Sequence, residues 1–87
     1  MSIRIQNHVH AVTDPDGAVL LDVKNGKYFS LNGVGADIWE GLQGGLSVPE
    51  IEARIEREYG APPERVKADV AAFLGRLHTE KLVHAAR

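Results

Sequence analysis

The first third of the chain combines β-prone residues with an alternation of apolar and polar positions, the pattern of half-buried strands. It predicts three strands, over residues 9–13, 18–23 and 28–31. In the second of them, Val19, Leu21 and Val23 share one face. Turn signals at residues 14–17 and 24–27 separate the strands, and the second contains Asn-Gly, which favours a tight hairpin. Two tight turns make an antiparallel meander whose last strand lies at an edge.

The predicted edge strand is apolar and carries no charge after Lys27. Tyr28 and Ser30 should point to one side of it, and Phe29 and Leu31 to the other. An unpaired edge exposes backbone N–H and C=O groups, which proteins usually protect with charges or proline. One pair of side chains must face the helices. The open edge is suited to β-augmentation, in which an extended peptide adds a strand. The alternative is that the whole strand belongs to the core.

The rest of the chain repeats apolar residues with the spacing of amphipathic helices. Asn32 caps the first predicted helix, and a glycine pair at 44–45 ends it. Ser47 opens a capping box at the start of the second helix, which Gly60 stops. The third helix starts within residues 61–64, since proline is tolerated in a first turn. Its apolar stripe is Val66, Val70, Phe73, Leu74 and Leu77.

Three strands followed by three helices predict an α+β, winged-helix-like domain with the helices on one face of a small antiparallel sheet. The chain has 87 residues, 44% of them hydrophobic, which fits a single domain over residues 1–87 with one core. We expect the ends, residues 1–7 and 84–87, to be disordered. Cysteine is absent, and no segment has the pattern of a signal peptide or a membrane span. We therefore expect a cytoplasmic protein.

Residues that could support catalysis or metal binding are few and scattered. His8 and His10 alternate on a predicted strand, but no third ligand lies nearby, so we interpret them as surface residues. Asp14, Asp16 and Asp22 lack the spacing and terminal glutamate of a calcium loop, and we interpret them as turn residues. The sequence contains no nucleophile elbow and no phosphate-binding loop. We expect no catalytic residue, no metal and no cofactor.

The charge balance also bears on possible partners. The formal net charge is -2, from 10 Lys+Arg and 12 Asp+Glu, which gives no basis for binding nucleic acid or an anionic membrane. Winged-helix proteins often bind DNA, and phosphate contacts would require an excess of basic residues on one helix. In the second and third predicted helices, acidic residues offset the basic ones. A DNA-binding or regulatory domain is therefore the alternative, and a scaffold for an enzyme complex is a third possibility.

The chain resembles the PqqD-like family in two segments, LLDVKNGKYFSLNGVGADIWEGLQGGLSVPEIEARIEREYG and ERVKADVAAFLGRLHTEKLV. Members of this family are peptide chaperones, or recognition elements, for ribosomally made and post-translationally modified peptides. The resemblance covers residues 10–84. The YFSLN-x-VG-x-x-IW version looks most like the stand-alone members encoded with lasso peptides. One departure is Lys81, where family members often have glycine.

The resemblance implies a function and a site. It implies a non-enzymatic protein that binds the leader of a precursor peptide and presents it to a leader peptidase and a lasso cyclase. The leader would pair with the third strand and lie in a cleft against the third helix. Carried over by position, the peptide-binding residues are Lys27, Tyr28, Phe29, Ser30, Leu31, Val66, Asp69, Val70, Phe73, Arg76 and Leu77. Three of them, Asp69, Phe73 and Arg76, fall within about 60° of one another on a helix.

Overall fold

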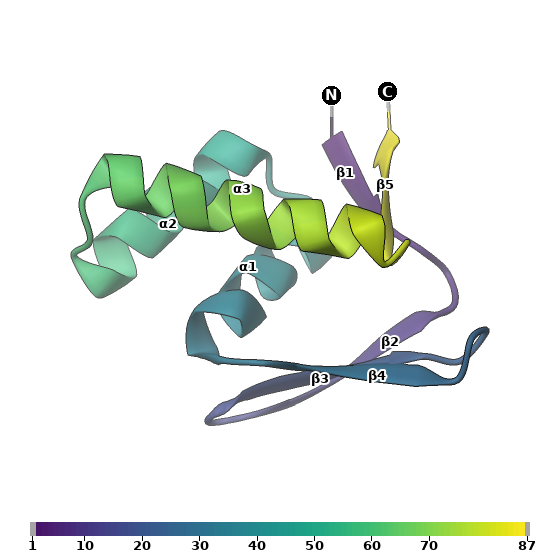
Figure 1. Ribbon diagram of the computed structural model, residues 1–87. Coiled ribbons are helices and arrows are strands. Elements are labelled where there is room, and N and C mark those ends of the chain that lie inside the picture. Colours follow the sequence, from purple (N-terminus) through teal and green to yellow (C-terminus); the bar gives the residue numbers. More distant parts are fainter. Residues whose placement is uncertain (1, 87) are drawn as a thin grey trace.

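The computed structural model describes residues 2–86. Its elements in chain order are β1 (Ser2–Ile5), β2 (Val9–Asp14), β3 (Gly17–Asp22), β4 (Lys27–Leu31), α1 (Gly33–Gln43), α2 (Val48–Tyr59), α3 (Pro63–Thr79) and β5 (Val83–Ala86). Strands β2, β3 and β4 form an antiparallel sheet in that order, and the helices follow it (Figure 1). The predicted α+β order, a three-stranded meander and then three helices, is confirmed.

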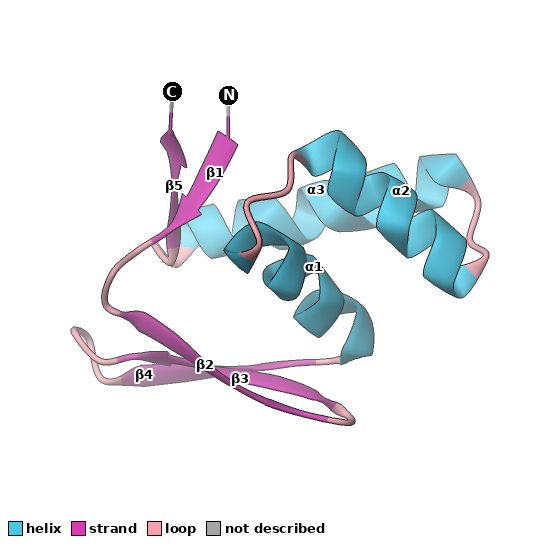
Figure 2. Cartoon of the chain, turned by 180° about the vertical axis from the view of Figure 1, so that it is seen from behind, coloured by secondary structure: helices cyan, strands magenta, loops and turns pink. Residues whose placement is uncertain are grey.

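The antiparallel register decides which strand residues face the helices. Leu20 pairs with Phe29, and Ala18 pairs with Leu31. All four side chains lie in the core or pack against it. The helices cover this face of the sheet, while the opposite face is open (Figure 2). Tyr28, on the open face, is 73% exposed. The predicted alternation along β4 is therefore confirmed, with Phe29 and Leu31 as the inward pair.

The apolar face predicted for the second strand is the outer one. Leu21 is 38% exposed, and Val23, which follows the end of β3, is 63% exposed. The inward residues are Ala18, Leu20 and Asp22. Asp22 ends the strand because its carboxylate accepts hydrogen bonds from the turn that follows. Because the buried face of β3 includes an aspartate, the pattern of apolar residues alone does not identify it as the buried face.

The expectation that the chain ends are disordered was wrong for the strands β1 and β5. These strands pair antiparallel, from Ser2 opposite Ala86 to Ile5 opposite Val83. Residues 1 and 87 lie outside the described part of the chain. Figures 1 and 2 show the two ends side by side. Val83 is 3% exposed, and Ile5 packs against the core. Burial and pairing thus order two short segments that have no local signal for a hairpin, because they meet only in the folded chain.

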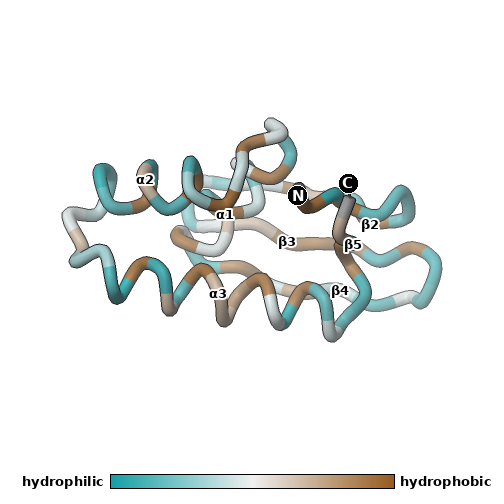
Figure 3. The backbone as a smooth tube through the Cα atoms, turned by 90° about the horizontal axis from the view of Figure 1, so that it is seen from above, coloured by the Kyte–Doolittle hydropathy of each residue, from teal (hydrophilic) through white to brown (hydrophobic). Residues whose placement is uncertain are grey.

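The predicted starts of α1 and α2 are confirmed by their caps, and α3 begins at Pro63, within the predicted range and without a side-chain cap. The Asn32 side chain accepts a hydrogen bond from the N–H of Gly35 at 2.8 Å. Ser47 and Glu50 form a reciprocal capping box at α2. Seen from above, α3 runs on the side of the molecule where β4 lies (Figure 3). This arrangement places a helix beside the open edge of the sheet. Within residues 2–86, no helix combines the length and the apolar character needed to cross a membrane.

The end of α3 contains a left-handed residue that is not glycine. Lys81 has a φ of 60°, and its N–H donates to the carbonyl of His78 at 3.0 Å. The next N–H, of Leu82, donates to the carbonyl of Leu77 at 2.9 Å. These are the two hydrogen bonds of a Schellman end, which favours glycine at the left-handed position. Lys81, where family members often have glycine, therefore ends α3 with regular hydrogen bonds but with a strained backbone conformation.

Candidate functional site

A groove lies where the end of β4, the start of α1 and one face of α3 meet. Its volume is about 400 Å³, and it is lined by Asn32, Val34, Gly35, Ile38, Arg65, Asp69 and Phe73. Val34, Ile38 and Phe73 supply its apolar surface. A β-carbon built on Gly35 would lie 3.2 Å from Cε1 of Phe73, so the absence of a side chain lets the ring approach α1 closely. We call this space the β4–α3 groove.

The edge strand β4 leads to this groove at its Leu31 end. Within residues 2–86, β4 pairs on one side, with β3. Lys27, Tyr28 and Ser30 are exposed, Phe29 is half-buried, and Leu31 is buried. The strand leads directly into Asn32, which lines the groove and caps α1. The unpaired backbone edge and the groove are therefore continuous along the chain.

The predicted residues of α3 fall into two groups. Val66, Val70 and Leu77 are at most 2% exposed, so they are core residues that support the groove from below. Asp69 and Phe73 line the groove. Arg76 is exposed but is not among the lining residues.

Sequence reasoning missed part of the lining. Val34 and Ile38 belong to the apolar repeat of α1, and this repeat indicated only a packed helix. Arg65 lies one turn before Asp69, and their side chains approach to 3.9 Å. This ion pair is 76% and 62% exposed at its two side chains, so it contributes little to stability. The (i, i+4) spacing of the two charges was the signal available for Arg65.

A larger cavity, of about 530 Å³, lies elsewhere, between the β1–β5 pair and the end of α1. Its lining mixes Ile3, Ile5 and Leu42 with polar side chains that include Arg4, Asn7, Gln43 and His84. The β4–α3 groove is smaller, but it lies at the end of the unpaired edge strand and is bordered by two helices, with Val34 and Phe73 among its lining residues. These features, and not volume, make it the candidate site.

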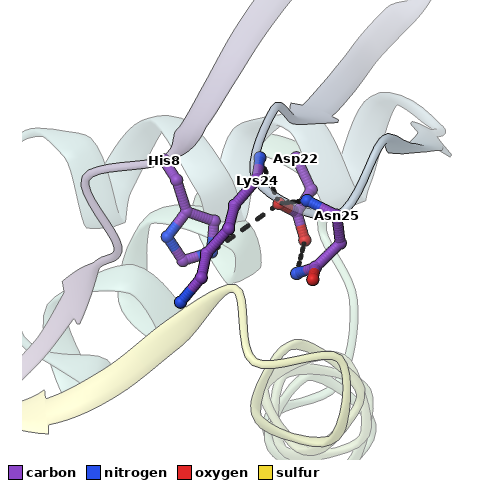
Figure 4. A network of polar contacts seen from close by, with 4 residues as sticks. All are labelled: His8, Asp22, Lys24 and Asn25. Carbon is purple, nitrogen blue, oxygen red and sulfur yellow. Dashed lines mark hydrogen bonds and ion pairs between the residues drawn. The ribbon is translucent and has the colours of Figure 1, made fainter.

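A polar network fixes the hairpin that leads into β4 (Figure 4). Asp22, only 2% exposed, pairs across the sheet with Lys27, the first residue of β4. Its carboxylate accepts hydrogen bonds from the side-chain amide of Asn25 at 2.8 Å, and from the N–H groups of Asn25 and Lys24. Nε2 of His8 lies 3.7 Å from the same carboxylate. The Asn25 side chain is the largest cause that lowers the pKa of Asp22, against an opposing effect of burial.

The interpretation of Asp22 as a turn residue was wrong, because Asp22 is the buried last residue of β3, although its carboxylate holds the turn that follows. His8, which we interpreted as a surface residue, lies beside this carboxylate, and its side chain is 24% exposed. Among the residues that the structure describes, no three His, Cys, Asp or Glu side chains are grouped to hold a metal ion. The β4–α3 groove offers the apolar side chains of Val34 and Phe73 and the charged pair of Arg65 and Asp69, next to the unpaired edge of β4. Such a site suits an extended peptide, whose backbone can pair with a strand while alternate side chains enter a groove.

Comparisons with known proteins identify a family and two similar solved structures. Residues 17–83 match the family described as coenzyme PQQ synthesis protein D (PqqD). No curated protein matches the chain. The solved structure of TbiB1 in complex with the TbiA(β) leader peptide is 32% identical, with a TM-score of 0.90 over 97% of this chain and 98% of that one. A lasso peptide synthetase B1 complexed with the leader peptide is 25% identical, with a TM-score of 0.88 over 98% and 100%.

Proposed function

The chain belongs to the PqqD family, and on that premise we propose that it binds the leader region of a ribosomally made precursor peptide. The observation that carries this proposal is the likeness, over nearly the whole chain, to two proteins whose structures contain leader peptides. The unpaired edge of β4, which ends at a groove lined by Val34 and Phe73, supports it independently. On this proposal the protein is a binding module and not an enzyme.

The peptide binds by adding a strand to β4. Its backbone takes up the free N–H and C=O groups of Lys27–Leu31, and its alternate side chains enter the β4–α3 groove. Phe73 is the main apolar contact on α3, because it lines the groove and is only partly buried. Asp69 and Arg76 contact the peptide at the rim. Val66, Val70 and Leu77 act from the core, by holding the groove in shape.

Binding at one edge leaves the remainder of a precursor free for other proteins. We propose that a leader peptidase and a lasso cyclase act on this free part, in the cytoplasm where the precursor is made. The purified protein alone should leave the precursor unchanged and should accelerate leader removal when the peptidase is added. Cleavage or modification of the precursor by this protein alone, detected by mass spectrometry, would refute the non-enzymatic role.

The direct test of binding is a titration with the leader segment of the precursor encoded beside this chain (the cognate leader). A fluorescently labelled cognate leader should bind saturably, and a scrambled peptide of the same composition should not. Equal binding of the two peptides, or no binding of either, would contradict leader recognition. A double-stranded DNA probe tests the alternative in the same assay, where the charge balance gives no reason to expect binding.

A further inference from the structure

The pair of strands formed by the two chain ends has an unpaired edge of its own. Within residues 2–86, β1 pairs on one side only, with β5. Figure 2 shows β1 between β5 and the connection from α1 to α2, so the free side of β1 faces the end of α1. We call this side of the strand the β1 edge.

The hydrogen bonds of the strand pair decide which backbone groups lie along the β1 edge. The N–H of Gln6 donates to the carbonyl of Leu82 at 3.0 Å, so Gln6 turns its backbone groups towards β5. Successive residues of a strand turn these groups to opposite sides, so Arg4 also turns them towards β5. Ile3 and Ile5 turn their N–H and C=O groups away from it. Within residues 2–86, these four groups have no backbone partner and can pair with an added strand.

The cavity of about 530 Å³ follows the β1 edge. Side chains of successive strand residues point to opposite faces, so Ile3 and Ile5 lie on one face of β1 and Arg4 on the other. All three residues line the same cavity, which therefore extends around the edge of the strand. Leu42 and Gln43, at the end of α1, line it from the other side. An extended segment that pairs with β1 would lie in this cavity.

The permanent charge in the lining of this cavity comes from Arg4. Its side chain is exposed, and it makes no ion pair with another residue of 2–86. The other polar side chains of the lining are those of Asn7, Gln43 and His84, and no Asp or Glu from the described part of the chain lines the cavity. A guanidinium between two apolar residues of one strand is complementary to an acidic residue between two apolar ones.

A second copy of the chain is the other occupant that an open strand edge invites. To use the free groups of both Ile3 and Ile5, two antiparallel copies of β1 must place each Ile3 opposite the other copy's Ile5. The two Arg4 side chains then lie directly opposite each other. Like charges in this position destabilise a strand pair. Arg4 therefore opposes self-pairing of the β1 edge, whereas the same charge attracts an acidic residue.

We propose that the β1 edge is a docking site for an extended segment of a second protein, with the pattern apolar–acidic–apolar. The segment adds a strand to β1, and its acidic residue pairs with Arg4. Its two apolar side chains lie beside Ile3 and Ile5 in the cavity. The proposal does not rest on leader binding. Because β1 and β4 belong to separate sheets, both edges can be occupied at once, and the domain can hold a second protein while β4 stays open.

The test is a selection from a display library of random peptides, which is first depleted on the Arg4→Glu variant and then enriched on the wild-type protein. The enriched peptides should share an apolar–acidic–apolar core. In amide exchange followed by NMR, they should newly protect the N–H groups of Ile3 and Ile5. The N–H of Arg4, which faces β5, is the internal control. Enriched peptides without this core, peptides that leave Ile3 and Ile5 unprotected, or a library that yields no binder would overturn the proposal.

A charge exchange between peptide and protein gives a second readout. An enriched peptide whose acidic residue is replaced by lysine should bind wild type about fivefold more weakly than its parent, and it should prefer Arg4→Glu to wild type. The matched control is Arg57→Glu, which changes the net charge equally at an exposed position of α2 outside the cavity, and it should leave the affinity of the parent peptide unchanged. Equal preference of both peptides for wild type and Arg4→Glu would contradict docking at this edge.

Titration of the cognate leader in the presence of a saturating enriched peptide separates the two sites. The affinity for the leader should be the same as without the peptide. Competition between the two would show that the peptide lies at β4, which would overturn the second site and leave leader binding intact. A protein that binds no leader would refute the proposed function, and protection of Ile3 and Ile5 by the enriched peptides would still decide docking at the β1 edge.

Discussion

The ring of Phe73 packs against the backbone of Gly35, so closely that a β-carbon at Gly35 would lie 3.2 Å from ring atom Cε1. This contact joins α3 to the first turn of α1 and sets the width of the β4–α3 groove. Gly35 therefore helps to shape the proposed binding site although it offers no side chain.

Gly35→Ala should weaken binding of the cognate leader, because the added methyl group pushes the Phe73 ring into the groove. The control is Gly75→Ala on α3, where a β-carbon meets nothing within 4 Å. Gly75→Ala should stabilise the protein by about 0.5–1 kcal/mol, as expected for alanine in an exposed helix interior, and leave binding unchanged. Thermal melts and leader titrations on both variants test the contrast. Equal affinity of the two variants would show that the contact does not shape the site.

Phe73→Ala should cost about 2 kcal/mol of binding free energy, because Phe73 is the large apolar side chain exposed to the groove from α3. It should also lower the melting temperature, since the ring packs partly against the core. Phe73→Leu keeps most of the apolar volume and should restore much of both losses. Titration and melting of the two variants separate the effect on the site from that on the fold. Wild-type affinity in folded Phe73→Ala would exclude the ring as an anchor.

The two charged residues proposed on α3 should differ in effect. Asp69 lines the β4–α3 groove, whereas Arg76 does not. Asp69→Ala should therefore change leader affinity more than Arg76→Ala does, and neither should unfold the protein, because both side chains are exposed. Titration of both variants with the cognate leader measures the two changes in affinity. A larger effect at Arg76 would mean that the peptide lies further towards the end of α3.

Lys81→Gly should raise the free energy of unfolding by about 1 kcal/mol, because a left-handed backbone costs other residues about 1–2 kcal/mol and glycine's freedom in the unfolded chain offsets part of the gain. Gly45 ends α1 with the same pair of hydrogen bonds and a φ of 79°. Gly45→Lys should therefore destabilise by a similar amount. Urea unfolding of both variants measures the two effects. An unchanged or lower stability of Lys81→Gly would show that the residue is not strained.

Acid should weaken the fold through Asp22. The pKa of the Asp22 carboxyl is lowered in the folded protein, first by the hydrogen bond from the Asn25 side chain. The ionised carboxylate therefore adds to the free energy of unfolding at pH values above its unfolded pKa of about 3.9. This added stability is lost as the pH falls through the lower pKa that Asp22 has in the folded protein. Asp22→Asn should therefore be less stable than wild type at neutral pH, and the gap should narrow in acid. Asp16→Asn, in an exposed turn, is the control. A gap that does not change with pH would contradict the role of the charge.

The sequence predicted the parts of the fold that are specified by neighbouring residues. Asn25 and Gly26 mark the turn before β4, and Asn32 and Ser47 mark the two helix starts, because turns and caps are short-range hydrogen-bonding patterns. The pairing of β1 with β5 could not be predicted in this way, because Ile5 and Val83 meet only through the folded core. Two strands from opposite ends of a chain share no turn to reveal them.

The candidate site was predicted only in part for the same reason. The edge strand and Phe73 could be assigned from alternation and from the family resemblance. Val34 and Ile38 were interpreted as packing residues, since an apolar stripe does not show which of its members border a hollow. The β4–α3 groove forms where Val34 of α1 meets Phe73 of α3, and the spacing of residues within one helix does not show that the two helices meet there.

Proline substitution probes the direction of the β4 amides. Along an edge strand, N–H groups point alternately to the neighbouring strand and to solvent, and proline removes the N–H. Proline at one of Phe29 and Ser30 should abolish leader binding with the helical circular dichroism intact, and proline at the other should damage the fold. Ser30→Ala is the control and should have a mild effect, because it keeps the backbone N–H. Two proline variants that both bind the leader would exclude pairing at this strand.

Amide hydrogen exchange with and without the cognate leader tests strand addition most directly, because it requires no substitution. The added strand should newly protect alternate amides between Lys27 and Leu31, namely those that point away from β3. Amides already bonded to β3 serve as the internal control and should change less. Tight binding of the leader without new protection in this segment would contradict strand addition to β4.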